Sequence, residues 1–378
     1  MKRILYVTTI SETINAFLVP HIEYLLDNNY EVECACNIGL NLDKRLLDKN
    51  LVIHDIPFSR SPLSTSNIGA YKKIKEVIKN GQYDYVHVHT PIAAFITRLA
   101  TRNMNISIIY TAHGFHFYKG APMLNWIVYY NLEKIAARWT DCIITMNEED
   151  FILAKEKFKY KNNKIFKING IGLDLNKYSN NSNDLREFKK SLGLKDEDFV
   201  ITIIAELIKR KNHLQIIDTM KLLYKEYPNI KVLFVGKGVL KDNYKKYIED
   251  NNLSESIKLL GFRNDVSEII NISNIIALFS LQEGLPRNLM EAMAIGKSII
   301  CTNIRGNNDL VKDNINGLLV PINDIQATKE AILKIYNDDK LAEKFSNNNI
   351  NDIKKYDIKE VLNEMNLIYK DIGLKENI

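Results

Sequence analysis

Residues 275–293 read Ile-Ile-Ala-Leu-Phe-Ser-Leu-Gln-Glu-Gly-Leu-Pro-Arg-Asn-Leu-Met-Glu-Ala-Met. The apolar run 275–280 predicts a buried strand of a parallel sheet. Gly284 then allows a tight turn, and Pro286 suits the first helical position because proline has no N–H group to leave without a partner. A helix is expected over 287–295. This strand, turn and helix form one unit of an α/β sheet.

The same alternation extends through the chain on both sides of this stretch. In the first half we expect strands at 4–7, 32–36, 52–56, 85–89, 106–111, 142–146 and 164–168. In the second half we expect strands at 199–204, 232–235, 257–260, 275–280 and 298–302. Strands separated by helices at this spacing require right-handed crossovers and a parallel sheet covered on both faces. The predicted fold class is α/β, with two tandem doubly wound Rossmann-like domains.

A change in amino-acid composition separates the two predicted domains. Residues 174–184 are rich in Asn and Ser and show no apolar periodicity, which favours a linker. We place the N-terminal domain at 1–173, the linker at 174–195 and the C-terminal domain at 196–357. Ligands of open α/β sheets bind at the carboxyl ends of strands, so we expect the chemistry in a cleft that both domains face.

The composition excludes several classes of protein. The chain has 378 residues, 46% hydrophobic and 26% charged, which is typical of soluble globular proteins. A net charge of +5 is far from that of a dedicated nucleic-acid binder, so no nucleic-acid partner is expected. The N-terminus lacks a signal-peptide core, and no apolar run reaches the ~18 residues of a membrane span. We expect a cytoplasmic location, with reduced cysteines in strand-like runs at 34, 36, 142 and 301.

The turn at 282–293 combines an anion site with two carboxylates. The amides of Arg287, Asn288 and Leu289 begin a helix and lack intrahelical partners, and the helix dipole adds positive potential. Such an end suits a diphosphate. Glu283 and Glu291 flank it, and since a carboxylate only accepts hydrogen bonds, we expect them to hold the hydroxyls of a sugar and of a ribose. The alternative is two solvated acids near a helix N-terminus.

These motifs resemble the signature of the retaining family 4 glycosyltransferases, which have the GT-B fold. The resemblance is carried by Glu283 and Glu291 with Gly284-Leu285-Pro286 between them, and downstream by Thr302–Gly306 and Asn316–Pro321. Upstream, Thr111-Ala-His113-Gly-Phe-His116-Phe and Thr140–Asn147 resemble a subgroup found in exopolysaccharide and capsule assembly. The resemblance covers nearly the whole chain. It implies that the C-terminal helix 358–372 crosses back onto the N-terminal domain.

The resemblance also implies a role for each matching residue. Glu283 would bind the donor sugar, Glu291 the ribose, and Lys211 would neutralise the diphosphate as it leaves. His113 would orient the donor or the oxocarbenium. The amides and side chains at the diphosphate would come from Gly284, Leu285, Pro286, Arg287, Asn288 and Leu289.

One position departs from the family pattern. Many members carry an arginine where this chain has Glu206, and Arg210 is a candidate replacement. The alternative for Arg210 and Lys211 is a solvated helix start. We expect no metal and no cofactor, because a helix N-terminus and Lys211 can together stabilise the leaving group.

The resulting hypothesis is a retaining, metal-independent transferase. It would move a sugar from a nucleotide-sugar, UDP favoured over GDP, to a glycan or polyprenyl-linked acceptor bound by the N-terminal domain. The rivals are a silent nucleotide-sugar-binding partner subunit and an epimerase or hydrolase of the same fold. Domain closure would bring His113 toward Glu283.

Three further features allow two interpretations each. The apolar helix 123–139 predicts either a buried helix or a peripheral membrane contact, with Trp126, Tyr129 and Tyr130 at the headgroups. His87 and His89 share a strand face and form either a buried pair with satisfied hydrogen bonds or metal ligands. The lysines at 72–79 form either a solvated face or a surface attracted to anions.

Overall fold

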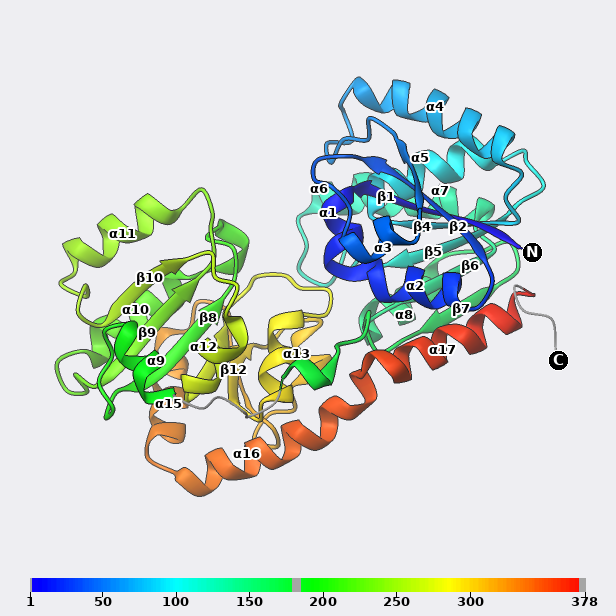
Figure 1. Cartoon of the computed structure of the whole chain (residues 1–378). Helices are drawn as coiled ribbons and strands as arrows, with labels where there is room; N and C mark the ends of the chain where they lie inside the picture. Colours follow the sequence, from blue (N-terminus) through cyan, green and yellow to red (C-terminus); the bar gives the residue numbers. More distant parts are fainter. Residues whose placement is uncertain (1, 179–184, 374–378) are drawn as a thin grey trace. The chain divides into compact units, whose positions relative to one another are not determined.

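The computed structural model describes residues 2–178 and 185–373, which divide into two compact units (Figure 1). Unit 1 comprises Met1–Gly172 and Ile358–Ile378, and unit 2 comprises Leu173–Asp357. Unit 1 is therefore built from two separate stretches of chain, and unit 2 is inserted between them.

Unit 1 contains a seven-stranded sheet in which every neighbouring pair is parallel. Its strands, in spatial order, are β3 (Val52–Asp55), β2 (Glu31–Asn37), β1 (Arg3–Ile10), β4 (Tyr85–His89), β5 (Ser107–Ala112), β6 (Cys142–Thr145) and β7 (Lys164–Lys167). All seven expected strands are present. The order reverses at β1, so the gap between β1 and β4 is a topological switch point.

The helices of unit 1 connect these strands. They are α1 (Ser11–Thr13), α2 (Val19–Asp27), α3 (Lys44–Asp48), α4 (Ser66–Gly81), α5 (Pro91–Thr101), α6 (Met123–Asn125), α7 (Asn131–Ala136), α8 (Glu148–Lys157) and α17 (Ile358–Asp371). Two π-helical segments, Ile14–Leu18 and Trp126–Tyr130, and a 3-10 turn at Ala137–Trp139 extend α1, α6 and α7.

Alternate residues of the strands pack into different layers. Val86, Val88 and Ile108 belong to the core beneath α4 and α5. Their neighbours His87 and His89 point to the opposite face, where His87 contacts Tyr6 and, from α17, Tyr369.

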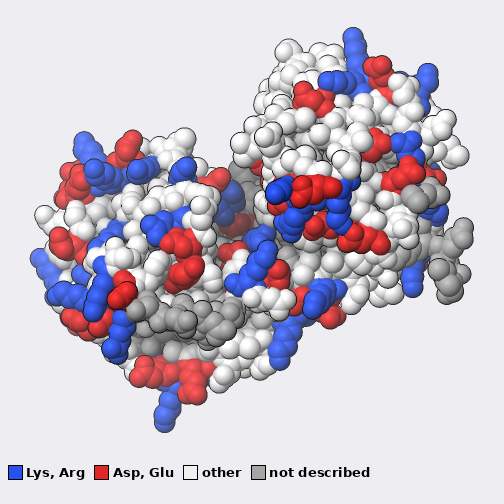
Figure 2. Space-filling model, viewed as in Figure 1, with Lys and Arg blue, Asp and Glu red and all other residues white. Residues whose placement is uncertain are grey.

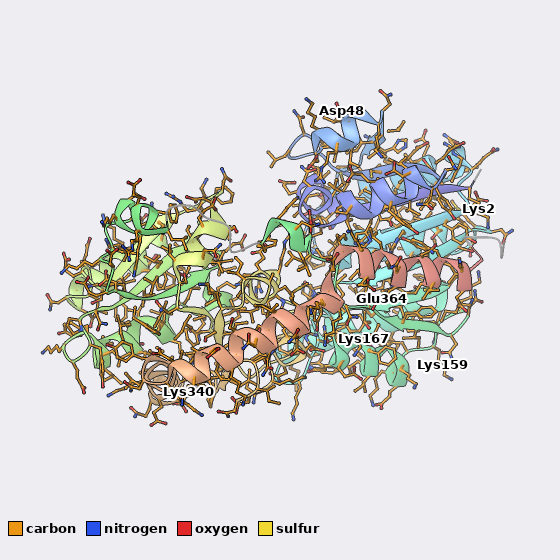
Figure 3. The ribbon with its side chains drawn as sticks, turned by 60° about the horizontal axis from the view of Figure 1, so that its bottom comes forward. Lys2, Asp48, Lys159, Lys167, Lys340 and Glu364 are labelled. Atoms are coloured by element: carbon orange, nitrogen blue, oxygen red, sulfur yellow. The ribbon has the colours of Figure 1, made fainter. Side chains whose placement is uncertain are left out.

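Helix α17 is tied to unit 1 by specific polar contacts. Glu364 accepts hydrogen bonds from the backbone N–H of Asn169 at 3.0 Å and from its side-chain amide at 2.6 Å (Figure 3). Tyr369 and Tyr6 share a buried hydroxyl–hydroxyl bond of 2.8 Å. The last helix is thus an integral layer of unit 1.

Unit 2 contains a six-stranded, fully parallel sheet. Its strands, in spatial order, are β10 (Ile257–Gly261), β9 (Ile230–Val235), β8 (Phe199–Ile204), β11 (Ile275–Leu278), β12 (Ser298–Thr302) and β13 (Leu318–Val320). Its helices are α9 (Leu185–Ser191), α10 (Leu214–Leu223), α11 (Lys241–Asp250), α12 (Val266–Ile272), α13 (Arg287–Ala294), α14 (Asn307–Leu310), α15 (Ile325–Tyr336) and α16 (Asp339–Asp352). Short 3-10 turns lie at Leu175–Lys177, Lys209–Lys211 and Ile353–Tyr356. The sequence analysis did not expect strand β13.

The segment assigned to a linker is partly structured. Residues 185–195 include α9, whose Leu185 and Phe188 pack with Leu194 against the core of unit 2. The rest of the predicted linker includes residues 179–184, which lie outside the described residues. Helix α9 follows the Asn-rich stretch and was not expected, because Leu185 and Phe188 are too few apolar residues to establish a helical period.

The helical segment 123–139 matches neither of its two interpretations fully. It is only partly buried, and its aromatic residues do not point to the solvent as a membrane contact through them would require. Trp126, Tyr129 and Tyr130 pack against the core of unit 1. Met123 and Leu124, by contrast, are 78% and 67% exposed. A helix with apolar residues on every side gives no period from which its buried face could be read.

Charge on the surface is mixed in sign. Figure 2 shows lysine and arginine side chains interspersed with acidic ones over the visible face of both units. In the described part of the chain, every helix is too short or too polar to cross a bilayer.

A buried ion pair in unit 1 makes a first prediction. Arg98 of α5 binds both carboxylate oxygens of Glu133 on α7, at 2.6 and 3.0 Å, and its guanidinium lies 4.2 Å from the ring centre of Tyr110. Glu133→Gln leaves the Arg98 charge buried and unpaired, so we expect the free energy of unfolding to fall by about 3–5 kcal/mol in urea titrations.

The matched control is Glu148→Gln, which removes an exposed pair with Lys167. This variant should unfold close to wild type, because exposed pairs contribute little. Equal loss in both variants would contradict the assigned importance of the buried pair.

Candidate functional site

The predicted pair Lys211 and Glu283 meets at the carboxyl edge of the unit 2 sheet. Lys211 follows β8 and Glu283 follows β11, the strand next to it. The Lys211 ammonium lies 2.5 Å from Glu283 Oε1. Arg210 Nη1 lies 3.6 Å from Oε2 of the same carboxylate and donates to the carbonyl of Gln282 at 3.0 Å. Glu283 is only 8% exposed, so this group of charges is held in a partly desolvated place.

Arg210 therefore lies where a cation of the site could act, and Glu206 does not. Glu206 is exposed, one turn of chain before the 3-10 segment that carries Arg210 and Lys211. Gly236 supports this loop from behind: its φ is +153°, and a Cβ there would lie 2.0 Å from the carbonyl oxygen of Ala205. Only glycine permits that approach.

A third loop, after β12, closes on the same turn. The buried Arg305 donates from Nε to the backbone carbonyl of Glu283 at 3.2 Å. Gly306 has a φ of +82°, and a Cβ there would lie 2.4 Å from the carbonyl oxygen of Gly284. Arg305 was given no role from the sequence. The Arg305-Gly306 pair, shortly after the end of β12, was the feature of the sequence that could have indicated it.

The start of α13 differs in detail from the expected anion site. Helix α13 begins at Arg287, so Pro286 is its N-cap residue instead of its first helical residue. The side chain of Asn288 accepts from the Leu289 N–H at 3.0 Å and donates to the carbonyl of Ile204 at 2.8 Å. Leu289 itself is buried. The expectation of three open amides was wrong for Leu289, because a side chain one residue away satisfies its N–H.

Glu291 lies one turn into α13 with two partners. Tyr178 donates its hydroxyl to Oε1 at 2.8 Å, and Arg287 Nε lies 3.1 Å from the same oxygen. Burial raises the pKa of Tyr178, and the Glu291 carboxylate raises it further, so the phenol remains a donor. Both of these contacts use Oε1. Tyr178 was not expected at the site, since it stands in an Asn-rich segment without periodicity.

In unit 1, His113 directly follows β5 and belongs to a buried group of histidines. Its Nε2 lies 3.1 Å from Nδ1 of His89, and the ring of His89 lies 4.3 Å from that of His87. His87 Nε2 in turn contacts the Thr111 hydroxyl at 2.7 Å. His89 Nε2 is buried and has no hydrogen-bond partner among the described residues. Both histidines of the pair are buried as expected, but the expectation that the pair is satisfied is wrong for His89 Nε2.

Burial sets the charge of these histidines. Burial, with a smaller contribution from neighbouring histidines, lowers the pKa of His113 to about 4 and that of His87 to about 3. The pKa values of His89 and His21 are lowered for the same main reason. The group is therefore uncharged near neutral pH, and His113 offers a neutral imidazole. Within residues 2–178 and 185–373, no three His, Cys, Asp or Glu side chains are grouped so as to hold a metal ion.

A cavity of about 300 Å³ opens at the carboxyl edge of the unit 1 sheet. It is lined by residues at or just after the ends of β1, β4 and β5, together with Arg60 and Tyr129: Thr9, Thr13, Arg60, Thr90, Pro91, Ile92, His116 and Tyr129. His116, expected to be structural, packs its ring 4.6 Å from that of Tyr129 and also faces this cavity. This region could not be defined from the sequence, because its first loop, Thr8–Glu12, has no glycine.

Comparison with known proteins agrees with this arrangement. The family model described as "Glycosyl transferase 4-like" matches residues 3–147, and that described as "Glycosyl transferases group 1" matches residues 184–352. EpsD of Bacillus subtilis (strain 168) is 33% identical over 382 residues, covering 99% of both chains. The UDP-Gal:alpha-D-GlcNAc-diphosphoundecaprenol alpha-1,3-galactosyltransferase of Escherichia coli is 34% identical over 299 residues, covering 76% of both chains.

Solved structures show the same architecture. Anabaena HepE, crystallised in complex with UDP and glucose, matches with a TM-score of 0.81 at 17% identity, over 98% of this chain and 100% of its own. A glycosyltransferase from Rickettsia africae ESF-5 matches with a TM-score of 0.80 at 22% identity, over 100% and 99%. Two parallel sheets of seven and six strands with this likeness define the GT-B fold. The chain belongs to the family 4 glycosyltransferases.

The buried histidines predict that unit 1 is sensitive to acid. Their folded pKa values lie below the ordinary 6.5, so between pH 6.5 and about 4 the unfolded chain binds more protons than the folded one. Stability is therefore complete above about pH 6.5 and is lost as the pH falls. Urea midpoints measured at pH 7, 6 and 5 should decrease stepwise.

His89→Gln provides the comparison, because it removes one of these titrating groups. As the pH falls, the free energy of unfolding of this variant should decrease less steeply than that of wild type. The difference in slope corresponds to about one proton fewer taken up on unfolding. Imidazole NMR signals follow each histidine separately, including His213 of unit 2, whose pKa burial also lowers to about 3. A His113 signal that titrates near pH 6.5 would contradict the prediction.

Proposed function

We propose that this glycosyltransferase is retaining and metal-independent, and that it moves a sugar from a UDP-sugar to a glycan or polyprenyl-linked acceptor in cell-surface polysaccharide synthesis. The observation that carries the proposal is the meeting of Lys211, Arg210 and Glu283 beside the N-terminus of α13. The diphosphoundecaprenol-linked acceptor named for the Escherichia coli relative and the UDP bound by HepE support the choice of substrates.

Each residue of unit 2 has a role that follows from its charge. Diphosphate departure leaves negative charge, and the Lys211 ammonium can balance it in a partly buried place where electrostatic interactions are strong. The contact with Lys211 keeps the Glu283 carboxylate oriented, so that it can accept from sugar hydroxyls. Glu291, held through Oε1 by Tyr178 and Arg287, offers Oε2 to a ribose hydroxyl.

Unit 1 supplies the acceptor side of the proposal. The cavity of about 300 Å³ carries threonine hydroxyls for an acceptor sugar and one cation, Arg60, for a diphosphate. His113, neutral at physiological pH, is suited to hydrogen-bond a donor sugar without adding charge beside an oxocarbenium-like carbon. We assign it a positioning role and no covalent one.

The donor site is tested by titrating the purified protein with UDP and with GDP by calorimetry, in EDTA. We expect micromolar binding of UDP, about 100-fold weaker in Glu291→Ala because the ribose loses its charged acceptor. Glu268→Ala is a matched control on another helix of unit 2. With a donor identified, NMR of the product decides the retaining mechanism from its anomeric configuration.

The opposite results are equally informative. Binding of neither nucleotide would overturn the donor site and favour a silent partner subunit. Binding that requires a divalent cation would overturn metal independence. UDP-sugar turnover that never needs an acceptor would favour the epimerase or hydrolase.

We also propose that unit 1 contacts the inner face of the cell membrane peripherally. Met123, Leu124 and Ile127 are 78%, 67% and 57% exposed on one side of the helical segment, near the exposed Lys134 and Arg138. Apolar side chains flanked by cations suit an anionic bilayer surface. The residues that make the contact would thus differ from the aromatic ones first expected.

Flotation with phosphatidylglycerol vesicles tests this contact. We expect the wild-type chain to float with the vesicles and the triple variant Met123→Ser, Leu124→Ser, Ile127→Ser to remain at the bottom. The control variant Val239→Ser, Phe262→Ser changes exposed apolar residues of unit 2 and should float like wild type. If wild type fails to float, or if the triple variant floats equally well, the contact does not exist.

A further inference from the structure

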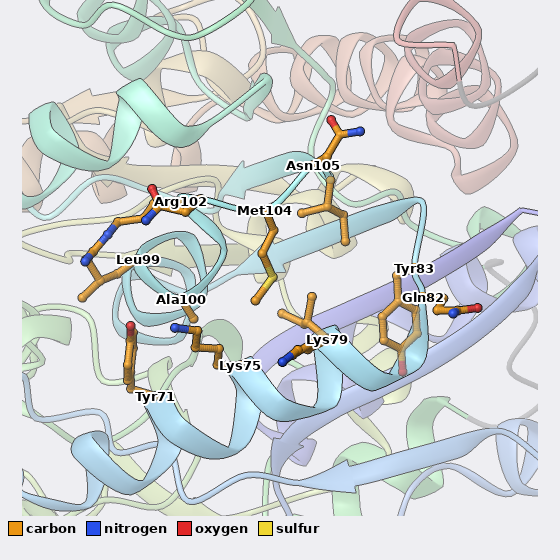
Figure 4. A pocket seen from close by; sticks show the side chains of 13 residues that line it. Tyr71, Lys75, Lys79, Gln82, Tyr83, Leu99, Ala100, Arg102, Met104 and Asn105 are labelled. Atoms are coloured by element: carbon orange, nitrogen blue, oxygen red, sulfur yellow. The ribbon is translucent and has the colours of Figure 1, made fainter.

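Unit 1 has a larger cavity at the edge of its sheet opposite to the functional loops (Figure 4). It measures about 460 Å³, within the range of small-molecule sites. It lies between α4 and the segment that joins α5 to β5. Gln82 and Tyr83 precede β4, and residues 103–106 precede β5, so the cavity is at the amino ends of these strands. His113 follows β5, so the strand's own length separates the two places.

The cavity is lined by three cations. Lys75 and Lys79 lie one turn apart on α4 and line the cavity, and the Lys75 ammonium lies 5.8 Å from the ring centre of Tyr71 (Figure 4). Arg102 lies at the rim. None of the 13 described residues that line the cavity is an aspartate or a glutamate. A concave surface with charges of one sign concentrates ions of the opposite sign.

The remaining lining is amphipathic. Ile78 and Ala100 are buried, and the half-buried Met104 and Ile106 continue this apolar floor. Tyr71 and Tyr83 add two aromatic rings. The Tyr83 ring packs directly against the end of α4: a Cβ on Gly81 would lie 2.2 Å from it. The hydroxyl of Tyr83 is anchored by Glu33 at 2.5 Å, so this wall of the cavity is rigid.

Three amide side chains complete the lining: Gln82, Asn103 and Asn105. Amides both donate and accept hydrogen bonds, as hydroxyl-rich ligands require. Cations, amides and an apolar, partly aromatic floor together match one ligand chemistry, a sugar ring that carries an anionic group.

We propose that this cavity is a second site, which binds a small phosphorylated saccharide. Lys75, Lys79 and Arg102 hold the phosphate, the amides bind hydroxyls, and the less polar face of the sugar ring rests on the apolar floor. The site is separate from the donor and acceptor sites and does not depend on the proposed function. It would let the enzyme sense or retain an anionic sugar away from its catalytic loops.

Calorimetric titration of the full chain with glucose 1-phosphate tests the proposal. UDP is present at saturation, so that the diphosphate site of unit 2 is occupied; if UDP does not bind, the donor assignment fails and the titration is run without it. The test variant is Lys75→Gln, Lys79→Gln. The matched control is Lys72→Gln, Lys73→Gln, which removes the same charge from exposed positions of α4 that do not line the cavity.

We expect glucose 1-phosphate to bind wild type and the control alike, with affinity that decreases as salt is raised. Binding should be about tenfold weaker or more in the test variant, because two charge-assisted contacts are lost. Glucose and inorganic phosphate should each bind more weakly than the combined ligand. The proposal is overturned if glucose 1-phosphate does not bind, if both variants lose binding equally, or if inorganic phosphate binds as tightly.

Discussion

A parallel sheet needs helices on both of its faces, and this requirement organises each unit of the protein. All strands of such a sheet run the same way, so every connection crosses over a face and all carboxyl ends share one edge. In unit 2 that edge gathers Lys211, Glu283 and Arg305 from the loops after three strands that lie side by side. In unit 1 it gathers the buried His113 and the cavity that Thr9 and Thr90 line.

The two edges differ in their electrostatics: that of unit 2 carries charged groups, and that of unit 1 carries neutral ones. The unit 2 group is made of full charges in contact, Lys211 and Arg210 with Glu283, and remains partly open to solvent. The unit 1 group consists of imidazoles that burial keeps neutral, such as His89 and His113. Charges are thus provided where a diphosphate is proposed to bind, and neutral hydrogen-bonding groups where an electron-poor sugar carbon is proposed to react.

Strand-end placement could be predicted from sequence because buried parallel strands leave strong apolar runs. This is why Lys211 and Glu283, 72 residues apart, were expected together and are found together. Contacts that depend on one side chain could not be predicted: Asn288 satisfying the Leu289 amide, or Tyr178 reaching Glu291 from an aperiodic segment. The helix 123–139 failed for the opposite reason, since an apolar residue at nearly every position hides which face is buried.

Insertion of unit 2 within unit 1 has a consequence for biosynthesis. All strands of the unit 1 sheet leave the ribosome before unit 2 does, but α17, which packs Tyr369 against Tyr6, emerges only after unit 2. Unit 2 can complete its own core while unit 1 still waits for α17. Until then the side of the sheet that carries Tyr6 and His87 lacks the cover that α17 provides, and such incompletely covered surfaces are where chaperones act and aggregation starts. A stop codon between unit 2 and α17 should therefore harm unit 1, although its sheet is translated earlier.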